Sequence, residues 1–333
     1  MEIMNPRDRF KALMSLKEVD RLPLMEWAGY WDKTVNRWYE EGLDRSLKDA
    51  WEIRRYFGLD SYRQYWISPR SSDCKIPARH GGPIIVNMDE YLELKPFLYP
   101  PTAFDKDMIQ SWAMEQQKNE TVVWITLEGF FWFPRTLLGI ENHLYAFYDQ
   151  PELIHMMNHD LIEFNLRVMK EFCELCVPDF MTFAEDMSYN NGPMISKTEF
   201  NKFIRPYYGQ IVPGLKELGI TPFVDSDGDI VQLLPWLTEI GIEGVLPLER
   251  MAGVDIVAIR RQFPKVKLIG GFDKTTMHKG CEAMRAEFER LLPVMRQGGY
   301  VPSVDHQTPP DVSLNNYLLY VSLLKEYCIK SGH

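Results

Sequence analysis

The sequence predicts an α/β protein, a (β/α)8 TIM barrel that occupies residues 1–333 as a single domain. Short apolar and β-branched runs alternate with longer helical patterns, and eight such runs occur along the chain. No flexible linker or shift in composition divides them. Strands that alternate with helices form parallel sheets, and eight strands close a barrel. A doubly wound open sheet is the alternative, but the Gly-rich phosphate-binding fingerprint that often follows its first strand is missing.

The predicted elements follow one another in a regular order. The charged amphipathic start, "MEIMNPRDRFKALMSL", predicts an N-terminal helical extension. The predicted strands then cover residues 22–27, 62–67, 121–129, 179–186, 220–228, 242–249, 265–273 and 300–306. Helical patterns such as "DIVQLLPWLTEIG" and "DIVAIRRQF" lie between most of them. In residues 71–96 two β-like runs flank "GGP", which predicts a small β-hairpin inserted over the rim of the barrel.

Composition argues against several classes of function. The formal net charge of −10 disfavours a nucleic-acid partner, because phosphate binding requires clustered Lys and Arg. No run approaches the roughly 18 apolar residues of a membrane span, and the N-terminus has no apolar signal core. The five cysteines form no disulfide framework, and Cys173 and Cys176 lie in a helical pattern. We therefore expect a cytoplasmic protein from a reducing compartment.

Acidic residues mark the ends of nearly all predicted strands, where TIM barrels carry their chemistry. These acids are Glu26, Glu128, Glu185, Asp186, Asp225, Asp227, Glu249, Asp273 and Asp305. A single Asp in such a place often caps the following helix, which is the reading we adopt for Asp229. As a set they would repel one another strongly at one barrel mouth. Some of them must therefore be protonated, paired with a cation or bound to a metal.

One histidine accompanies these acids. Of the seven histidines only His306 lies at a predicted strand end. Carboxylates with an imidazole are a common composition for divalent metal sites. The sequence therefore predicts a metal held by some of Asp225, Asp227, Glu249 and His306, although spacing alone does not select the ligands.

Aromatic residues gather at or just beyond the first three strand ends. They include Trp27, Tyr30, Trp66, Phe131 and Trp132. Aromatic side chains most often pack in cores, but a cluster near one mouth also suits a flat or largely apolar ligand. We expect these five residues to contribute to substrate binding.

With these residues in view, the chain resembles the uroporphyrinogen decarboxylase superfamily, which includes the corrinoid-linked methyltransferases. The likeness runs in order through "PRDRFKALMSLKEVDRLPL", "GIENHLYAFYDQPELIHMMNHDL", "DMSYNNGPMISKTEFNKFIRPYY", "DSDGDI", "VLPLERMAGVDI", "IGGFDK" and "VDHQTPPDVSLNNY". The resemblance implies a (β/α)8 barrel, in agreement with the strand count. It also implies that His306 matches the histidine that the family places after its last strand.

Two departures from the family pattern narrow the expected chemistry. Uroporphyrinogen decarboxylases carry two arginines in an "RQAGR"-like motif, where this chain has "EWAGY" with Glu26 and Tyr30. Those arginines hold a polyanionic substrate, and an acid in their place would repel it. The thiol-methylating members bind zinc through a His-x-Cys, where this chain has Asp225 and Asp227. Hard oxygen ligands in place of thiolates suit activation of an oxygen-bearing group, such as a methoxy substrate.

The resemblance therefore implies a metal-dependent methyltransferase that acts on a small, partly apolar methylated substrate. The metal would be a divalent ion such as zinc, and the corrinoid would arrive on a partner protein. Glu185, Asp186 and Glu26 are the candidate catalytic acids. The family often forms homodimers. Two alternatives stay open: a metal-free decarboxylase of a smaller acid, held by Arg63, Arg135 or Arg205, and a non-catalytic binding barrel. These three arginines are the cations closest to the predicted mouth.

Overall fold

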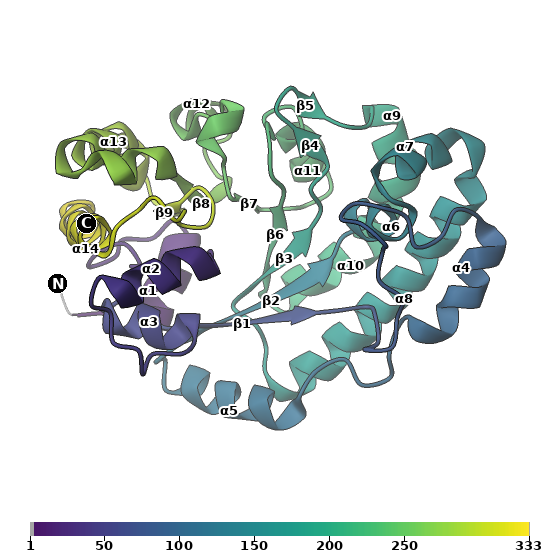
Figure 1. Cartoon of the computed structure of the whole chain (residues 1–333), viewed down its shortest axis with the longest axis horizontal. Helices are drawn as coiled ribbons and strands as arrows, with labels where there is room; N and C mark the ends of the chain where they lie inside the picture. Colours follow the sequence, from purple (N-terminus) through teal and green to yellow (C-terminus); the bar gives the residue numbers. More distant parts are fainter. Residues whose placement is uncertain (1–2, 333) are drawn as a thin grey trace.

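A computed structural model of the chain describes residues 3–332. Seven parallel strands form one curled sheet in the order β1-β2-β3-β6-β7-β8-β9, with helices packed outside it (Figure 1). The strands are β1 (Tyr62–Ile67), β2 (Val122–Glu128), β3 (Phe180–Ala184), β6 (Thr221–Asp225), β7 (Gly244–Leu246), β8 (Lys267–Phe272) and β9 (Tyr300–Val304). Each lies within a strand range that the sequence predicted, so the predicted TIM-barrel type of fold is confirmed.

The predicted first strand, residues 22–27, is not a regular strand. It is an extended segment between the two edge strands of the sheet. The carbonyl of Leu24 accepts the Asp60 N–H at 2.8 Å just before β1, and the Trp27 N–H donates to Ser303 Oγ of β9 at 3.2 Å. The Asp60 carboxylate also accepts the Leu24 N–H at 2.9 Å. One backbone bond and two bonds that involve side chains thus replace a regular backbone ladder at the eighth position, so the barrel sheet of the described residues has seven paired strands.

Helices follow most strands and cover the outside of the sheet (Figure 1). They are α1 (Pro6–Met14), α2 (Asp32–Glu40), α3 (Ala50–Tyr56), α4 (Met88–Leu94), η1 (Lys95–Phe97), α5 (Lys106–Gln117), α6 (Trp132–Leu138), α7 (Ile140–Asp149), α8 (Pro151–Leu175), α9 (Lys197–Glu199), η2 (Phe200–Ile204), α10 (Arg205–Glu217), α11 (Leu234–Glu239), η3 (Arg250–Ala252), α12 (Ile256–Gln262), η4 (Lys274–Lys279), α13 (Cys281–Met295) and α14 (Leu314–Lys330). The first, α1, forms the predicted N-terminal helical extension, whereas α2 and α3 follow the extended segment 22–27. In the described part of the chain no helix has the length and apolar character that a bilayer span needs.

The hairpin predicted for residues 71–96 is wrong. Within the described residues this stretch forms turns and then α4, and its ends are joined only by an isolated antiparallel bridge between Arg70 and Leu98. Asn87 accounts for the difference. Its side chain accepts the Glu90 N–H at 2.9 Å and caps α4, which begins directly after the second apolar run. A two-residue antiparallel pair, β4 (Ser188–Tyr189) with β5 (Gly192–Pro193), lies instead after β3.

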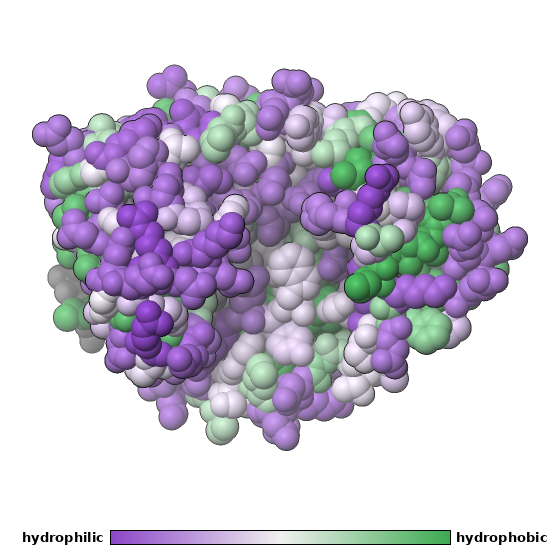
Figure 2. Space-filling model, viewed as in Figure 1, coloured by the Kyte–Doolittle hydropathy of each residue, from purple (hydrophilic) through white to green (hydrophobic). Residues whose placement is uncertain are grey.

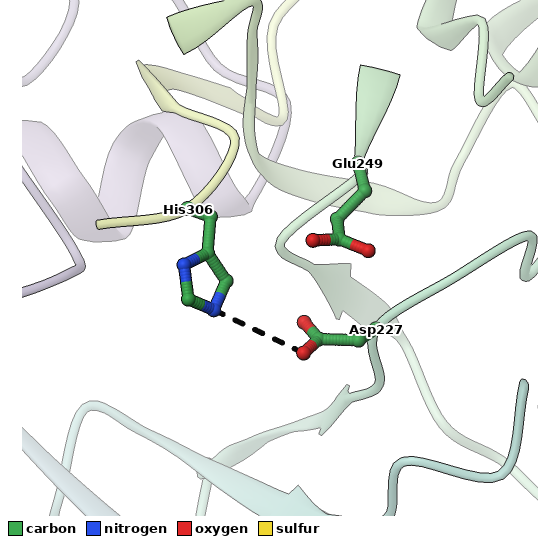
Figure 3. Close-up of side chains that lie close together, drawn as sticks. All are labelled: Asp227, Glu249 and His306. Carbon is green, nitrogen blue, oxygen red and sulfur yellow. Dashed lines mark ion pairs between the residues drawn. The ribbon is translucent and has the colours of Figure 1, made fainter. Parts of the chain in front are cut away.

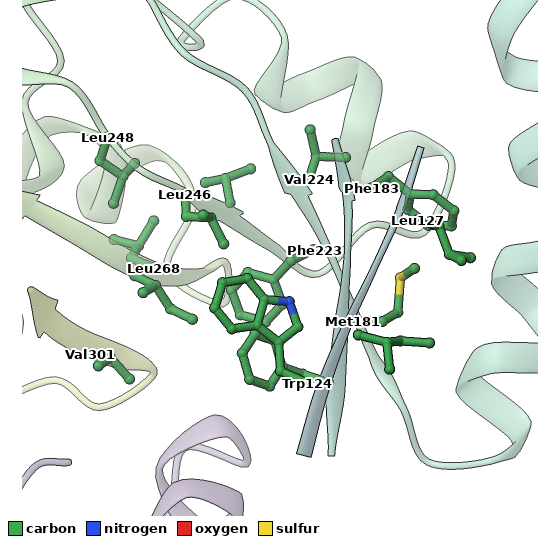
Figure 4. Packing of buried hydrophobic residues seen from close by; sticks show 14 of the residues in the cluster. Trp124, Leu127, Met181, Phe183, Phe223, Val224, Leu246, Leu248, Leu268 and Val301 are labelled. Carbon is green, nitrogen blue, oxygen red and sulfur yellow. The ribbon is translucent and has the colours of Figure 1, made fainter. Parts of the chain in front are cut away.

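The core fills the interior of the curled sheet and the space between sheet and helices (Figure 4). Trp124 of β2 stacks on Phe180 of β3 with ring centroids 5.1 Å apart. The ring of Phe223 lies so close to Gly244 that a Cβ there would come within 2.2 Å of it. Large aromatic side chains therefore close the lower part of the barrel and leave the strand ends for the site.

Candidate metal and substrate site

The carboxyl ends of the strands surround a cavity of about 330 Å³. It is lined by Trp27, Ala28, Gly29, Gln64, Trp66, Trp132, Ala184, Asp186, Asp225, Asp227, His306 and Gln307. Figure 2 shows that mainly hydrophilic side chains cover this side of the molecule and that the surface is hollowed near its centre. The cavity thus lies where a TIM barrel places its chemistry, and acids and aromatic rings share its wall.

Three side chains from separate loops meet at this mouth. Ligand atoms of Asp227, Glu249 and His306 all lie within 4.8 Å of one another, and the three side chains point toward a common space (Figure 3). His306 Nε2 lies 3.9 Å from Asp227 Oδ2. Asp227 follows β6, Glu249 follows β7 and His306 follows β9. Three of the four predicted metal ligands are therefore brought together.

The loop after β6 is fixed by hydrogen bonds to its neighbours. The Asp227 N–H donates to Asp186 Oδ1 at 3.0 Å, and the Gly228 N–H donates to Glu249 Oε2 at 3.0 Å. Gly228 has a φ of +81°, and a Cβ there would lie 2.9 Å from the carbonyl of Tyr189. Only glycine fits this turn, which orients Asp227 toward Glu249 and His306.

The electrostatics of the cluster suit a cation. Burial, together with Asp186 and Glu249, raises the pKa of Asp227 to about 7. Burial, reinforced by Lys274, lowers the pKa of His306, so its imidazole is held neutral as a metal ligand requires. Two carboxylates and one neutral imidazole are a donor set that zinc, manganese and iron accept. The residues present therefore fit a divalent metal.

Asp225 and Asp186 line the same cavity without belonging to the three-residue cluster. Burial raises the pKa of Asp225 well above its usual range, and the neighbouring Asp186 and Asp227 raise it further. Burial also raises the pKa of Asp186, whose backbone adopts a left-handed φ of +34°. Burial and crowding thus favour the protonated form of both acids, which are candidates for proton exchange inside the cavity.

The neighbouring Glu185 is placed differently, because it is fully buried and does not line the cavity. Its two oxygens accept the N–H groups of Phe130, Phe131 and Trp132 at 2.8–3.1 Å, and the Tyr208 hydroxyl donates to the same carboxylate. Glu185 therefore anchors the start of α6. A Cβ on Gly129 would come within 2.2 Å of this side chain, so the loop is built around it.

Glu26 also lies outside the cavity lining. Its side chain is 1% exposed, and the Tyr320 hydroxyl donates to its carboxylate. Burial raises the pKa of Glu26 to about 7. The Tyr62 hydroxyl donates to the Glu26 carbonyl at 2.7 Å, so the residue links the segment 22–27 to β1. Of the three candidate catalytic acids, the structure places only Asp186 at the cavity.

The five aromatic residues expected to bind substrate divide into two groups. Trp27, Trp66 and Trp132 line the cavity. Tyr30 and Phe131 are buried in the core, where the Tyr30 hydroxyl bonds the Tyr317 hydroxyl at 2.9 Å and Phe131 packs against His143. Three indole rings around a small cavity provide flat apolar surface for a ligand.

With this geometry in place, comparison with known proteins identifies the family. The family model described as "Uroporphyrinogen decarboxylase (URO-D)" matches residues 118–327, which is more than half of the chain. The chain belongs to the uroporphyrinogen decarboxylase family. No curated protein matches it significantly.

Solved structures resemble this URO-D family chain only distantly. A B12-independent methionine synthase from Shewanella sp. W3-18-1, in complex with selenomethionine, is 14% identical and covers 70% of this chain and 69% of its own, with a TM-score of 0.43. A putative vitamin-B12 independent methionine synthase from Listeria monocytogenes is 11% identical, and the match covers 92% of this chain and 96% of that protein, with a TM-score of 0.48. Similarity at this level carries no information about the reaction.

The other strand-end acids of the URO-D chain have local structural partners. Trp66 Nε1 donates to Glu128 at 3.1 Å, and the Arg250 and Lys274 N–H groups donate to Asp305 at 3.0 and 3.3 Å. The remaining two accept N–H groups within the following turn: Asp273 accepts the Thr275 N–H at 2.8 Å and Asp229 accepts the Val231 N–H at 3.0 Å. The prediction that Asp229 caps the following helix is wrong, because α11 begins at Leu234 with Leu233 as its N-cap, and the Asp229 side chain closes a turn at Val231 instead.

Several residues at the cavity were missed by sequence reasoning. Gln64 and Gln307 line the cavity. Burial raises the pKa of Asp305 to about 6, and Lys274 lies close enough for its charge to counter part of that rise. Strand alternation could have found Gln64, because it is two residues from Trp66 on the same face of β1. Gln307 follows His306 directly. Lys274 stands in the quoted "IGGFDK" motif, where its charge offsets the acids.

Proposed function

We propose that this URO-D family protein transfers a methyl group between a small, partly apolar methylated substrate and a corrinoid carried by a separate protein. The observation that carries the proposal is the cluster of Asp227, Glu249 and His306 at the mouth of the barrel. A divalent metal held there, zinc being the first candidate, would act as a Lewis acid on an oxygen of the substrate.

The chain's own residues divide the remaining work. Trp27, Trp66 and Trp132 offer apolar surface to the body of the substrate and exclude water from it. Asp186 lies at the cavity and holds the Asp227 loop through one oxygen, which leaves its other oxygen for proton exchange with the substrate. Asp225 lies beside it as a second acid.

The size of the cavity supports a small substrate and a corrinoid that arrives on a partner. Pockets for drug-sized ligands run from roughly 300 to 1,000 Å³. A cavity of about 330 Å³ is at the lower limit of that range and is far too small to enclose a corrin macrocycle. The corrinoid would therefore approach the open mouth from outside.

The decarboxylase alternative requires an arginine that can hold the carboxylate of the substrate, but two of the three candidate arginines are paired with other residues. Arg63 is paired with Glu115 at 2.7 Å and 2.9 Å and lies on the opposite face of β1 from Gln64. Arg205 pairs with Glu239 at 3.6 Å on exposed side chains. Of the three arginines, Arg135 alone lies near the cavity: its Nη1 donates to the carbonyl of the cavity residue Asp186 at 2.9 Å.

The first experiment is elemental analysis of the metal in purified protein and in an Asp227→Ala, His306→Ala double variant. We expect about one zinc, manganese or iron per chain, lost in the double variant. Asp229→Asn is the matched control, because it changes an acid of the same loop that only caps a turn. The same three proteins are then assayed for methyl transfer to and from a corrinoid protein and for CO₂ release from candidate acids.

The outcomes separate the three functions. Bound metal with methyl transfer that the double variant loses supports the proposal. CO₂ release without bound metal would establish a decarboxylase instead. Ligand binding that is unchanged in the double variant, with no turnover of any kind, would indicate a non-catalytic binding barrel.

A further inference from the structure

A second cavity lies beside the mouth, and Trp132 lines both cavities. Its volume is about 210 Å³. The polar side chains that line it are Arg70, His80, Arg135 and Thr136, and the apolar ones are Pro77, Trp132 and Ile140. None of these residues except Arg135 and Trp132 has a part in the function proposed above.

Two guanidinium groups converge on this cavity from different segments. Arg70 follows β1, whereas Arg135 lies in α6. Within the described residues neither guanidinium has a carboxylate oxygen within the 4.0 Å of an ion pair, in contrast to Arg63 and Arg205. Both arginines are half-buried. Glu128 lies near Arg70 and Asp186 near Arg135, but only at a range beyond that of an ion pair. Partly buried cations without a directly paired anion are costly, and binding of an anion recovers part of that cost.

Most of the hydrogen-bond donors of the two side chains are left for a ligand. Arg135 Nη1 donates to the Asp186 carbonyl at 2.9 Å, and Arg70 Nη2 donates to Thr136 Oγ1. Each guanidinium has five N–H donors in a planar fork, and that fork matches the two oxygens of a carboxylate. These bonds also fix both arginines in place before any ligand arrives.

The apolar part of the cavity wall favours an anionic group that is attached to an apolar body. The Arg135 guanidinium carbon lies 5.0 Å from the centroid of the Trp132 ring, so charge and flat apolar surface adjoin. Pro77 and Ile140 extend that surface. A bare inorganic anion would leave it uncovered, whereas a carboxylate on an apolar body would cover it.

We propose that Arg70, Arg135 and His80 form an anion-binding subsite for a small carboxylic acid whose apolar body packs against Trp132. The inference deepens the proposed function, since the shared indole makes this acid a part of the substrate or a ligand bound beside it. It assigns to the protein a preference for acids over their neutral analogues.

Benzoate and its neutral analogue benzamide test the subsite by isothermal titration calorimetry. We expect benzoate to bind at least tenfold more tightly than benzamide and more tightly than acetate, which lacks the apolar body. Arg135→Gln and Arg70→Gln should each abolish the preference for benzoate. Arg135→Lys should retain part of it, because the charge remains. Arg205→Gln, which removes an exposed arginine outside both cavities, should leave it unchanged.

The binding assay contains no corrinoid protein and measures no turnover. It can therefore support the subsite even if methyl transfer is not observed, and it can refute the subsite even if methyl transfer is observed. Equal affinities for benzoate and benzamide in the unmodified protein would overturn the inference, as would a preference that survives both Gln variants. Acetate binding as tight as benzoate binding would overturn the role of Trp132. Thermal unfolding of each variant verifies that the loss of binding is not a loss of the fold.

Discussion

At the scale of single residues, this protein keeps two carboxyl groups, Glu26 and Glu185, buried and a third, Glu128, half-buried. Burial raises the pKa values of Glu26, Glu128 and Glu185 to about 7. Each raised pKa lowers the stability of the folded state at every pH at which the same carboxyl group is ionised in the unfolded chain. Glu26 and Glu185 are also tied to hydroxyl and N–H donors, so they act as structural acids beside a chemical site.

The pH dependence of Glu26 has a definite sign. Its pKa rises from a reference near 4.5 to about 7 on folding, so its contribution to stability is fully present below pH 4.5 and is lost as the pH rises toward 7. At about 1.4 kcal/mol per pKa unit, Glu26→Gln should be up to ~3 kcal/mol more stable than the unmodified protein at pH 8. The two proteins should be nearly equal at pH 4.5. Urea unfolding across this range measures the difference, with the exposed Glu163→Gln as control; identical pH profiles for all three would contradict it.

Two adjacent acids should respond to substitution in opposite ways. Glu185→Ala leaves buried donors of residues 130–132 and Tyr208 unpaired, at about 1–3 kcal/mol for each unsatisfied group, so the free energy of unfolding should fall by ~3 kcal/mol or more. Asp186→Asn can still accept the Asp227 N–H, so the protein should fold normally. Its rate of methyl transfer should fall by roughly 100-fold or more. Denaturation and activity assays on both variants test the pair, and a stable Glu185→Ala protein would remove the anchoring role.

At the scale of elements, the site depends on short loops that follow strands of fixed register. Strand β6 pairs with β7 through Asp225 and Leu246, and the Ser226 N–H continues that pairing to the Leu246 carbonyl at 3.0 Å. The chain then turns at Gly228 and returns toward β4. Parallel register therefore sets the height of Asp227 and Glu249 at the barrel mouth.

Gly228→Ala tests this loop. The substitution places a Cβ 2.9 Å from the Tyr189 carbonyl in a left-handed conformation, so the loop must move and the affinity for metal should fall at least tenfold. Gly219→Ala is the matched control, because its φ of +73° is also left-handed but no atom lies within 4 Å of the new Cβ. The control should lose about 1 kcal/mol of stability and keep its metal. Metal titration of both variants decides, and equal affinities would show that the turn does not position Asp227.

At the scale of the whole molecule, the site joins loops that lie far apart in the sequence. Asp227, Glu249 and His306 come from three strands, and residues 22–27 close the barrel beside His306 through Trp27, whose ring lies 6.3 Å from the imidazole. A metal at this point would bridge separate parts of the barrel. It should therefore stabilise the whole fold and not only its own loops.

Metal removal tests this linkage. A ligand present at 100 times its Kd stabilises the folded state by about 2.7 kcal/mol, which for a chain of this length corresponds to roughly 4 °C in Tm. A chelator should lower the Tm of the purified protein by about this amount. The Asp227→Ala, His306→Ala variant should show no change. A chelator that leaves the Tm of the unmodified protein unaltered would argue against a metal at this cluster.

The sequence by itself determined the barrel, the ranges of seven strands and the acid-rich mouth with His306, because local periodicity and strand-end chemistry are properties of short segments. Tertiary structure alone decided the rest. It separated Asp186 from Glu185, and Trp132 from Phe131, since neighbours at a strand end or helix start face different surroundings. It also formed turns and α4 where a hairpin was predicted for residues 71–96, and it brought Arg70 and Arg135 to one cavity, because burial and partnership depend on which distant segments meet.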